Sequence, residues 1–156
     1  MSDTRAPDLR QPEIYPHWTD DIVRFSDLDR LNHVNNVSFA TYCESGRVDF
    51  LESSWPGCTA GTGIGWVIAE LRLKYLAAGH YPNAVRIGTR VLHVGNSSVL
   101  LGQGLFIAGQ CFATAESVLV WADTRLQKSL PMEEALKQQL RLYCQSSSVA
   151  SSTLPR

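Results

Sequence analysis

Carboxylate, amide and imidazole side chains gather in one short stretch of this chain, residues 23–51. Asp27, Asp29, Asn32 and His33 follow one another within a few positions. They lie in a polar turn, where the packing of apolar side chains cannot be what selects them. The pattern after the turn is helical. A carboxylate just before the N-terminus of a helix can do chemistry, and we take this turn as the candidate site.

The predicted helix positions these polar groups. Asn35 or Asn36 supplies its N-cap, because an amide oxygen there accepts from an N–H of the first helical turn. From residue 37 onward, residues recur at spacings of three and four, so one stripe can be buried. The stripe consists of Phe39, Tyr42, Cys43, Gly46 and Phe50. Because Gly46 lowers helix propensity, we expect a close approach to a sheet there. The helix is expected to end near Ser53, before a proline and a glycine.

The remaining elements are predicted to be mostly strands. One strand precedes the helix at residues 18–25, and four follow it, at 66–75, 85–94, 99–107 and 111–124. In the strand at 66–75, alternation places five residues on the buried face: Val67, Ala69, Leu71, Leu73 and Tyr75. A short helix is expected to start at Pro131. One long helix against consecutive long strands predicts an α+β layer, with the sheet curling around the helix.

Composition predicts one globular domain. The chain has 156 residues, of which 44% are hydrophobic, and it contains no apolar run long enough for a membrane span. Its 14 basic and 15 acidic residues give a formal net charge of −1 without a basic cluster, which argues against a nucleic-acid surface. We divide the chain into a flexible arm (1–15), the domain (16–142) and a disordered serine-rich tail (143–156). The N-terminus lacks the pattern of a signal peptide, so a cytoplasmic protein is expected.

Other kinds of site are excluded because the sequence lacks their motifs. The four cysteines have no CxxC spacing and no metal-ligand pattern. Asp27, Asp29 and His33 lack the glutamate and glycine that an EF-hand needs, and a dinuclear centre lacks further ligands nearby, so no metal site is expected. The glycine-rich stretch at 59–65 has neither the ending of a P-loop nor the spacing of a dinucleotide-binding loop.

The same stretch carries a resemblance to a known family. VRFSDLDRLNHVNN, followed by a helix containing Tyr42, Glu44 and Arg47, resembles the hot-dog-fold acyl-CoA thioesterases of the 4-hydroxybenzoyl-CoA thioesterase type. Two later segments, LRLKYLAAGHYPNAVRIGTRVLHVGNSSV and VLVWADTRLQKSLPMEEAL, resemble the later strands and the terminal helix of that family. The likeness covers residues 18–140, and its first motif is the specific one.

The resemblance implies a hot-dog fold, in which a curled five-stranded antiparallel sheet wraps a long central helix and dimerises through the sheet. A homodimer, and often a homotetramer, is the implied assembly. The implied activity is hydrolysis of an acyl-CoA to a carboxylic acid and coenzyme A, with coenzyme A present only as part of the substrate and no cofactor. Neither the length of the acyl chain nor its carrier follows from the residues.

The resemblance also assigns roles to individual residues. Asp29 becomes the general base or nucleophile, the backbone N–H of Asn36 the donor to the thioester carbonyl, and His33 an auxiliary group. Substrate-binding residues are Asn35 together with Gly65, Trp66 and Val67, of which the last three would line the acyl pocket of the partner subunit.

Alternatives stay open at this point. Asp29 could accept backbone N–H groups in its turn and do nothing else. Glu44 and Arg47, three residues apart, most simply form a pair on the helix surface. A hot-dog hydratase or dehydratase would use an Asp and a His, although in that class the His follows the Asp by five residues, whereas here the interval is four. A non-catalytic acyl-CoA-binding module is the third alternative.

Overall fold

A single curled antiparallel sheet and one long helix make up most of the molecule. The computed structural model describes residues 6–145. The strands are β1 (His17–Ile22), β2 (Ile64–Tyr75), β3 (Ala84–Val94), β4 (Ser98–Ile107), β5 (Gln110–Asp123) and β6 (Lys128–Ser129). The sheet order is β1-β3-β4-β5-β2, and the short β6 pairs with β5. The helices are α1 (Asn36–Ser54) and α2 (Glu134–Arg141), accompanied by the 3-10 turns Pro12–Ile14, Phe25–Asp27 and Leu142–Cys144.

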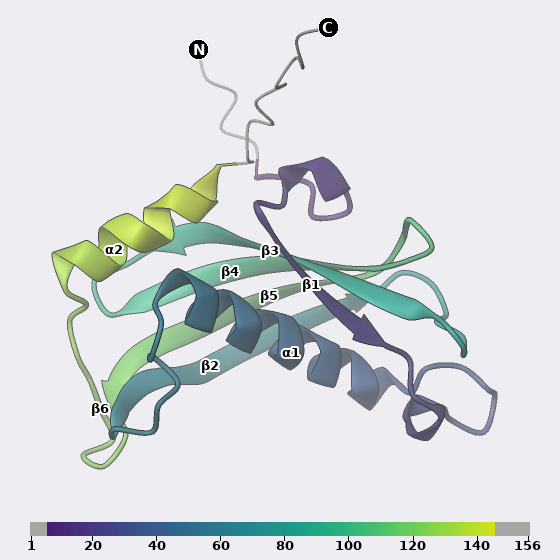
Figure 1. Ribbon diagram of the computed structural model, residues 1–156, viewed down its shortest axis with the longest axis horizontal. Helices are drawn as coiled ribbons and strands as arrows, with labels where there is room; N and C mark the ends of the chain where they lie inside the picture. Colours follow the sequence, from purple (N-terminus) through teal and green to yellow (C-terminus); the bar gives the residue numbers. More distant parts are fainter. Residues whose placement is uncertain (1–5, 146–156) are drawn as a thin grey trace, which may run out of the picture.

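Helix α1 packs across one face of the sheet (Figure 1). The predicted stripe of Phe39, Tyr42, Cys43, Gly46 and Phe50 is buried, as we expected. Gly46 makes the close contact, because a Cβ atom there would lie 2.4 Å from Cγ2 of Ile87 on β3. Gln103 on β4 fixes the same level of the helix by donating its side-chain N–H to the Cys43 carbonyl, at 3.1 Å. The fold class is therefore confirmed: a hot-dog arrangement of one helix in a curled antiparallel sheet.

Strand β2 carries a bulge that changes which residues face the helix. Ile68 pairs with Leu119 and Glu70 pairs with Val118, so Ala69 is an extra residue in the ladder. A bulge shifts the alternation of side chains along the strand by one residue. Before the bulge, the residues whose side chains face α1 are therefore Trp66 and Ile68. The expected placement of Val67 and Ala69 on the buried face is therefore wrong, whereas Leu71 and Leu73 pack on the core.

The first strand ends three residues earlier than predicted. Residues 23–25 were expected to continue it, but Phe25–Asp27 forms a 3-10 turn instead. The Asp27 carboxylate accepts a hydrogen bond from Arg24 N at 2.8 Å, and Asp27 N donates to Arg24 O at 2.9 Å. This reciprocal capping closes the chain into a turn and ends the strand.

The second helix starts later than predicted. We expected it to begin at Pro131, but it begins at Glu134. Met132 is buried and donates its backbone N–H to Asn96 O at 2.9 Å. This bond holds the preceding segment against the turn between β3 and β4, so the helix forms only after it. Of the part of the chain that the structure describes, no helix is long and apolar enough to cross a membrane.

The described part of the N-terminal segment packs on the sheet. Tyr15 is only 4% exposed and covers Gly88 and Gly104, which are paired across β3 and β4. Its hydroxyl group donates to Leu9 O at 2.5 Å, which fixes the approach of the chain. Of the arm predicted over residues 1–15, residues 6–15 are described, and Tyr15 belongs to the core. Of the predicted tail, residues 146–156 lie outside the described residues.

Replacing Gly46 tests the contact between helix and sheet. We expect Gly46→Ala to lower the free energy of unfolding by roughly 1–3 kcal/mol, because overpacking against Ile87 outweighs the gain in helix propensity. Ser53→Ala, at an exposed position of the same helix, should change it by less than about 0.5 kcal/mol. Urea denaturation measures both. A more stable Gly46→Ala variant would show that the helix does not approach the sheet this closely.

Replacing Tyr15 tests whether the N-terminal segment belongs to the domain. Tyr15→Ala should destabilise the fold by about 3 kcal/mol, because it removes a buried aromatic ring from the two glycines beneath it. Leu126→Ala, at a side chain that is 73% exposed, is the control and should have little effect. If thermal unfolding of Tyr15→Ala matches wild type, the segment contributes nothing to stability.

Candidate active site

Asp29 lies in a small closed turn between the 3-10 turn Phe25–Asp27 and α1. Its Oδ1 atom accepts backbone N–H groups from Leu31 at 2.8 Å and from His33 at 3.2 Å. Asp29 N donates to His33 O at 2.8 Å, and Asn32 takes a positive φ of 59° to close the turn. Within residues 6–145, no hydrogen bond reaches Oδ2. One oxygen of this carboxylate thus maintains the turn, and the other is available for chemistry.

The N-terminus of α1 follows directly and offers a free donor. Asn35 is the N-cap, since its Oδ1 accepts from Val37 N at 3.1 Å, which decides between the two caps we had considered. The Asn36 N–H makes no hydrogen bond with any described residue, as expected for the first residue of a helix. The positive end of the helix dipole adds to the attraction of this N–H for a negatively charged oxygen.

Asp27 connects the turn to the helix. The Tyr42 hydroxyl group donates to its Oδ2 atom at 2.6 Å, and Asn35 N donates to its carbonyl oxygen at 2.7 Å. Burial, and then the hydrogen bond to Asp27, raises the pKa of Tyr42, so its hydroxyl stays protonated and keeps donating. Asp27 is therefore a residue that positions the turn containing Asp29.

The His33 side chain contacts His80 and not Asp29. Its ring meets that of His80 edge-on, with the ring centroids 5.1 Å apart. Among the described residues its imidazole forms no hydrogen bond, and only its backbone contacts Asp29. The structure thus brings the backbone of His33, and not its imidazole, to the carboxylate.

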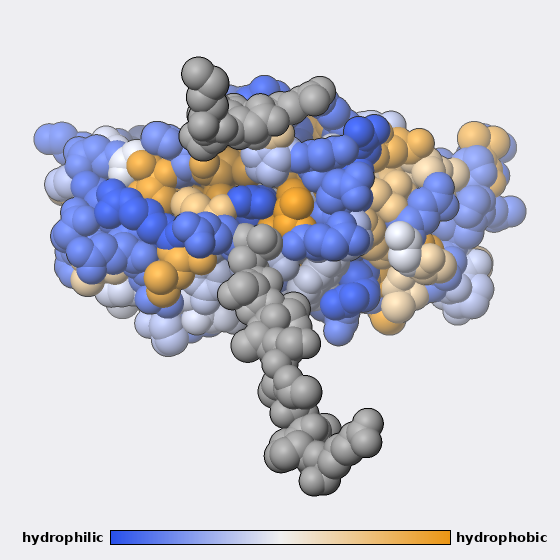
Figure 2. All heavy atoms as spheres, turned by 90° about the horizontal axis from the view of Figure 1, so that it is seen from above, coloured by the Kyte–Doolittle hydropathy of each residue, from blue (hydrophilic) through white to orange (hydrophobic). Residues whose placement is uncertain are grey.

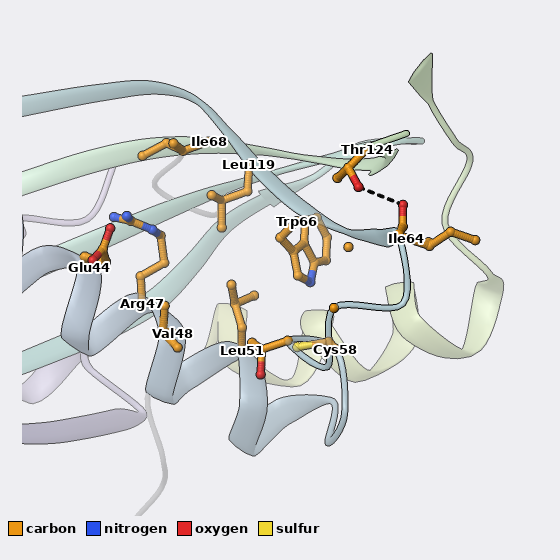
Figure 3. A pocket seen from close by; sticks show the side chains of 14 residues that line it. Glu44, Arg47, Val48, Leu51, Cys58, Ile64, Trp66, Ile68, Leu119 and Thr124 are labelled. Carbon is orange, nitrogen blue, oxygen red and sulfur yellow. Dashed lines mark hydrogen bonds between the residues drawn. The ribbon is translucent and has the colours of Figure 1, made fainter. Parts of the chain in front are cut away.

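A cavity of about 380 Å³ opens between α1 and β2, farther along the helix (Figure 3). Gly65 and Trp66 line it, whereas Val67 lies on the opposite face of the strand. Gly61 and Gly63, from the glycine-rich loop, complete its outer wall. None of Asp29, His33 or Asn36 lines this cavity. The sequence-predicted site residues therefore fall into two groups, one at the first turn of α1 and one around the cavity.

Arg47 is the residue that sequence reasoning misplaced. We expected a pair with Glu44 on the helix surface, but Arg47 is only 6% exposed and forms no ion pair within residues 6–145. Its guanidinium group lies in the cavity (Figure 3), and burial lowers its pKa. The sequence spacing could have predicted this burial, because Arg47 follows Cys43 by four positions and so shares the buried stripe.

The described residues offer no metal centre. Between residues 6 and 145, no group of three or more His, Cys, Asp or Glu side chains could hold a metal ion. Cys43 and Cys58 are free thiols, and burial raises their pKa values to about 12 and about 11, so both stay protonated near neutral pH. At the first turn of α1, Asp29 Oδ2 and the Asn36 N–H are the two predicted groups that have no hydrogen-bond partner among the described residues.

Comparison with known proteins places this geometry in a family. Residues 23–140 match the family model described as the thioesterase-like superfamily. The chain is 29% identical over 122 residues to the long-chain acyl-CoA thioesterase FadM of Escherichia coli (strain K12), covering 76% of this chain and 92% of FadM. It is 28% identical over 107 residues to the chloroplastic acyl-acyl carrier protein thioesterase ATL3 of Arabidopsis thaliana, covering 66% of this chain but only 56% of ATL3.

Solved structures agree with the sequence relatives. The PA5185 protein from Pseudomonas aeruginosa superposes with a TM-score of 0.78 at 27% identity, covering 86% of this chain and 95% of that one. A thioesterase from Thermus thermophilus, complexed with coenzyme A and Zn, gives a TM-score of 0.76 at 29% identity, covering 85% and 96%. The family match spans the turn, α1 and strands β2 to β6. The chain belongs to the thioesterase-like superfamily, a family of thioester hydrolases with the hot-dog fold.

Proposed function

We propose that this protein hydrolyses an acyl-CoA thioester to a carboxylic acid and coenzyme A, with Asp29 and the Asn36 N–H as the reacting and stabilising groups. The observation that supports this most is that Asp29 Oδ2 and the Asn36 N–H, in adjoining turns of the chain, both lack a hydrogen-bond partner among the described residues. FadM, which the chain covers almost fully, is named as an acyl-CoA thioesterase. A second relative by structure was solved with coenzyme A.

The chemistry follows from the two groups. A thioester already has a good leaving group, so the protein mainly has to orient an attacking oxygen and stabilise the oxyanion. As a general base, Asp29 removes a proton from water while the water oxygen adds to the carbonyl carbon; the C–S bond then breaks, and the thiolate takes the proton. As a nucleophile, Asp29 Oδ2 adds to that carbon and expels coenzyme A as its thiolate. Water then hydrolyses the resulting anhydride, which releases the acid, restores the Asp29 carboxylate and supplies the proton that the thiolate takes up. Both routes end in the same acid and thiol.

The helix N-terminus supplies the oxyanion site. Removing one oxyanion donor in other hydrolases costs about 3 kcal/mol of transition-state stabilisation, so the Asn36 N–H can contribute a useful share. Asn35 supports this role indirectly, because its cap bond goes to Val37 N and leaves Asn36 N free. The Tyr75 hydroxyl group donates to the Asn36 carbonyl at 3.2 Å, which helps to hold the first turn in place.

A second copy of the chain is the proposed partner. Strand β2 is an edge of the sheet and pairs only with β5 among the described strands. Apolar side chains stay exposed along this edge and on the neighbouring helix, namely Ile64, Val67, Ile68, Val37 and Val48. The side of the molecule that carries α2, seen in Figure 2, mixes hydrophilic residues with hydrophobic patches. Pairing β2 with its counterpart would cover this apolar edge and close the side of the cavity.

Removing the Asp29 charge tests the mechanism. Asp29→Asn keeps an oxygen that can accept the Leu31 and His33 N–H groups, so the turn should survive. We expect kcat to fall by about three orders of magnitude or more, since a carboxamide is neither a base nor a nucleophile. Release of free thiol from acyl-CoAs of varied chain length measures it. Asp20→Asn, at an exposed carboxylate on β1, is the matched control and should keep full activity.

Three outcomes would contradict the proposal in different ways. Unchanged kcat in a folded Asp29→Asn variant would remove Asp29 from the reaction. No thiol release from any acyl-CoA by wild type, together with saturable acyl-CoA binding, would indicate a binding module. Hydration of an enoyl-CoA without thiol release would identify a hydratase.

Charged substitutions on the edge strand β2 test the proposed dimer. We expect wild type to behave as a dimer in sedimentation analysis and the double variant Ile64→Lys/Val67→Lys to shift toward monomer, because lysines on an edge strand oppose sheet pairing. Ile22→Lys, on the opposite edge strand β1, is the control and should stay dimeric. A monomeric wild type at micromolar concentration would contradict this assembly.

A further inference from the structure

Two residues that line the cavity between α1 and β2 each carry a buried N–H donor that has no partner among the described residues. Arg47 Nη1 and Trp66 Nε1 are both inaccessible to solvent and have no acceptor in the described structure. They come from opposite walls, Arg47 from the helix and Trp66 from the strand (Figure 3). Buried donors are almost always paired. Something that enters this cavity is therefore expected to supply an acceptor.

Two hydroxyl groups of the cavity wall donate to other partners. The Thr59 hydroxyl group donates to the Glu52 carboxylate at 2.7 Å, and the Thr124 hydroxyl group donates to Gly63 O at 3.0 Å. Glu44 lines the same cavity from an exposed position of the helix, but it forms no ion pair with Arg47 among the described residues. None of these side chains accepts a hydrogen bond from either donor in the described structure.

The rest of the wall is apolar. Val48 and Leu51 contribute from the helix, and Ile68 and Leu119 from the sheet. An apolar wall with one donor on each side suits a hydrocarbon chain that carries an oxygen function. A plain hydrocarbon chain would fill the space but leave both donors unpaired.

The position of Arg47 sets where this oxygen must lie. Arg47 follows Asn36 by eleven residues on α1, which places it about 16 Å along the helix axis at about 1.5 Å per residue. Its side chain leans back toward the helix N-terminus, as long helical side chains do. An acceptor at this level is far from a thioester held at Asn36 and belongs at the distal end of the acyl chain.

We propose that the cavity selects acyl thioesters whose chain carries an oxygen acceptor at its distal end, with Arg47 and Trp66 as specificity-determining donors. The inference rests on the thioester hydrolysis proposed above. The acceptor is a carboxylate or a hydroxyl group. The permanent charge of Arg47 favours a carboxylate, whereas the neighbouring charge of Glu44 favours a neutral hydroxyl group, and the test separates the two.

Calorimetric binding to three matched ligands tests the proposal. These are decanoyl-CoA, ω-hydroxydecanoyl-CoA and the CoA monothioester of decanedioic acid, and the Asp29→Asn background prevents turnover. At least one oxygenated ligand should bind about tenfold more tightly than decanoyl-CoA, as for a hydrogen bond to a charged donor. Adding Arg47→Met, which keeps an unbranched apolar stem, should remove that preference. Thiol release by wild type is followed in parallel, so that failure of hydrolysis is seen separately from failure of selectivity.

Two further variants keep the result interpretable. Trp66→Phe removes the indole N–H while keeping an aromatic ring, and should reduce the preference in part, which decides the matter if Arg47→Met does not fold. Arg72→Met, at an exposed arginine of β2 that pairs with Glu70, is the control and should retain the preference. Equal affinity for all three ligands overturns the proposal. So does a preference that survives both Arg47→Met and Trp66→Phe.

Discussion

The close contact between α1 and the sheet at Gly46 is the constraint on which the rest of the structure depends. With no side chain at this position, the helix axis can approach Ile87 on β3, and the flanking aromatic residues then pack into the curl of the sheet. This contact fixes both ends of the helix at once. Its first turn is held beside the Asp29 turn, and its third and fourth turns border the cavity that opens toward β2.

The turn before α1 gives one carboxylate a structural role and, in the mechanism that we propose, a chemical role as well. Accepting two backbone N–H groups on one oxygen holds Asp29 in a single orientation, and this preorganisation is what a reacting group needs. The structural alternative for Asp29 and the catalytic one are therefore compatible, because they use different oxygens. Asp27 also holds the turn in place, because the hydrogen bond that it accepts from Tyr42 connects the turn to the buried face of the helix.

Much of this arrangement could be predicted from the sequence, because it rests on local patterns. The N-cap, the buried stripe of α1 and four of the long strands follow from periodicity and from turn residues. What could not be predicted depends on tertiary contacts. The bulge at Ala69 is invisible to simple alternation, and it decides that Trp66 rather than Val67 faces the helix. The burial of Tyr15 depends on glycines some seventy to ninety positions later in the chain. Arg47 was predicted to lie on the helix surface because it is charged, although its position in the sequence places it on the buried stripe.

The most direct test of the account is a crystal structure of the Asp29→Asn variant with an intact acyl-CoA bound. The account predicts the thioester carbonyl oxygen at about 3 Å from Asn36 N, the side chain at position 29 facing the carbonyl carbon, and the acyl chain running along α1 into the cavity. A thioester bound away from the first turn of α1, with the cavity empty, would contradict it.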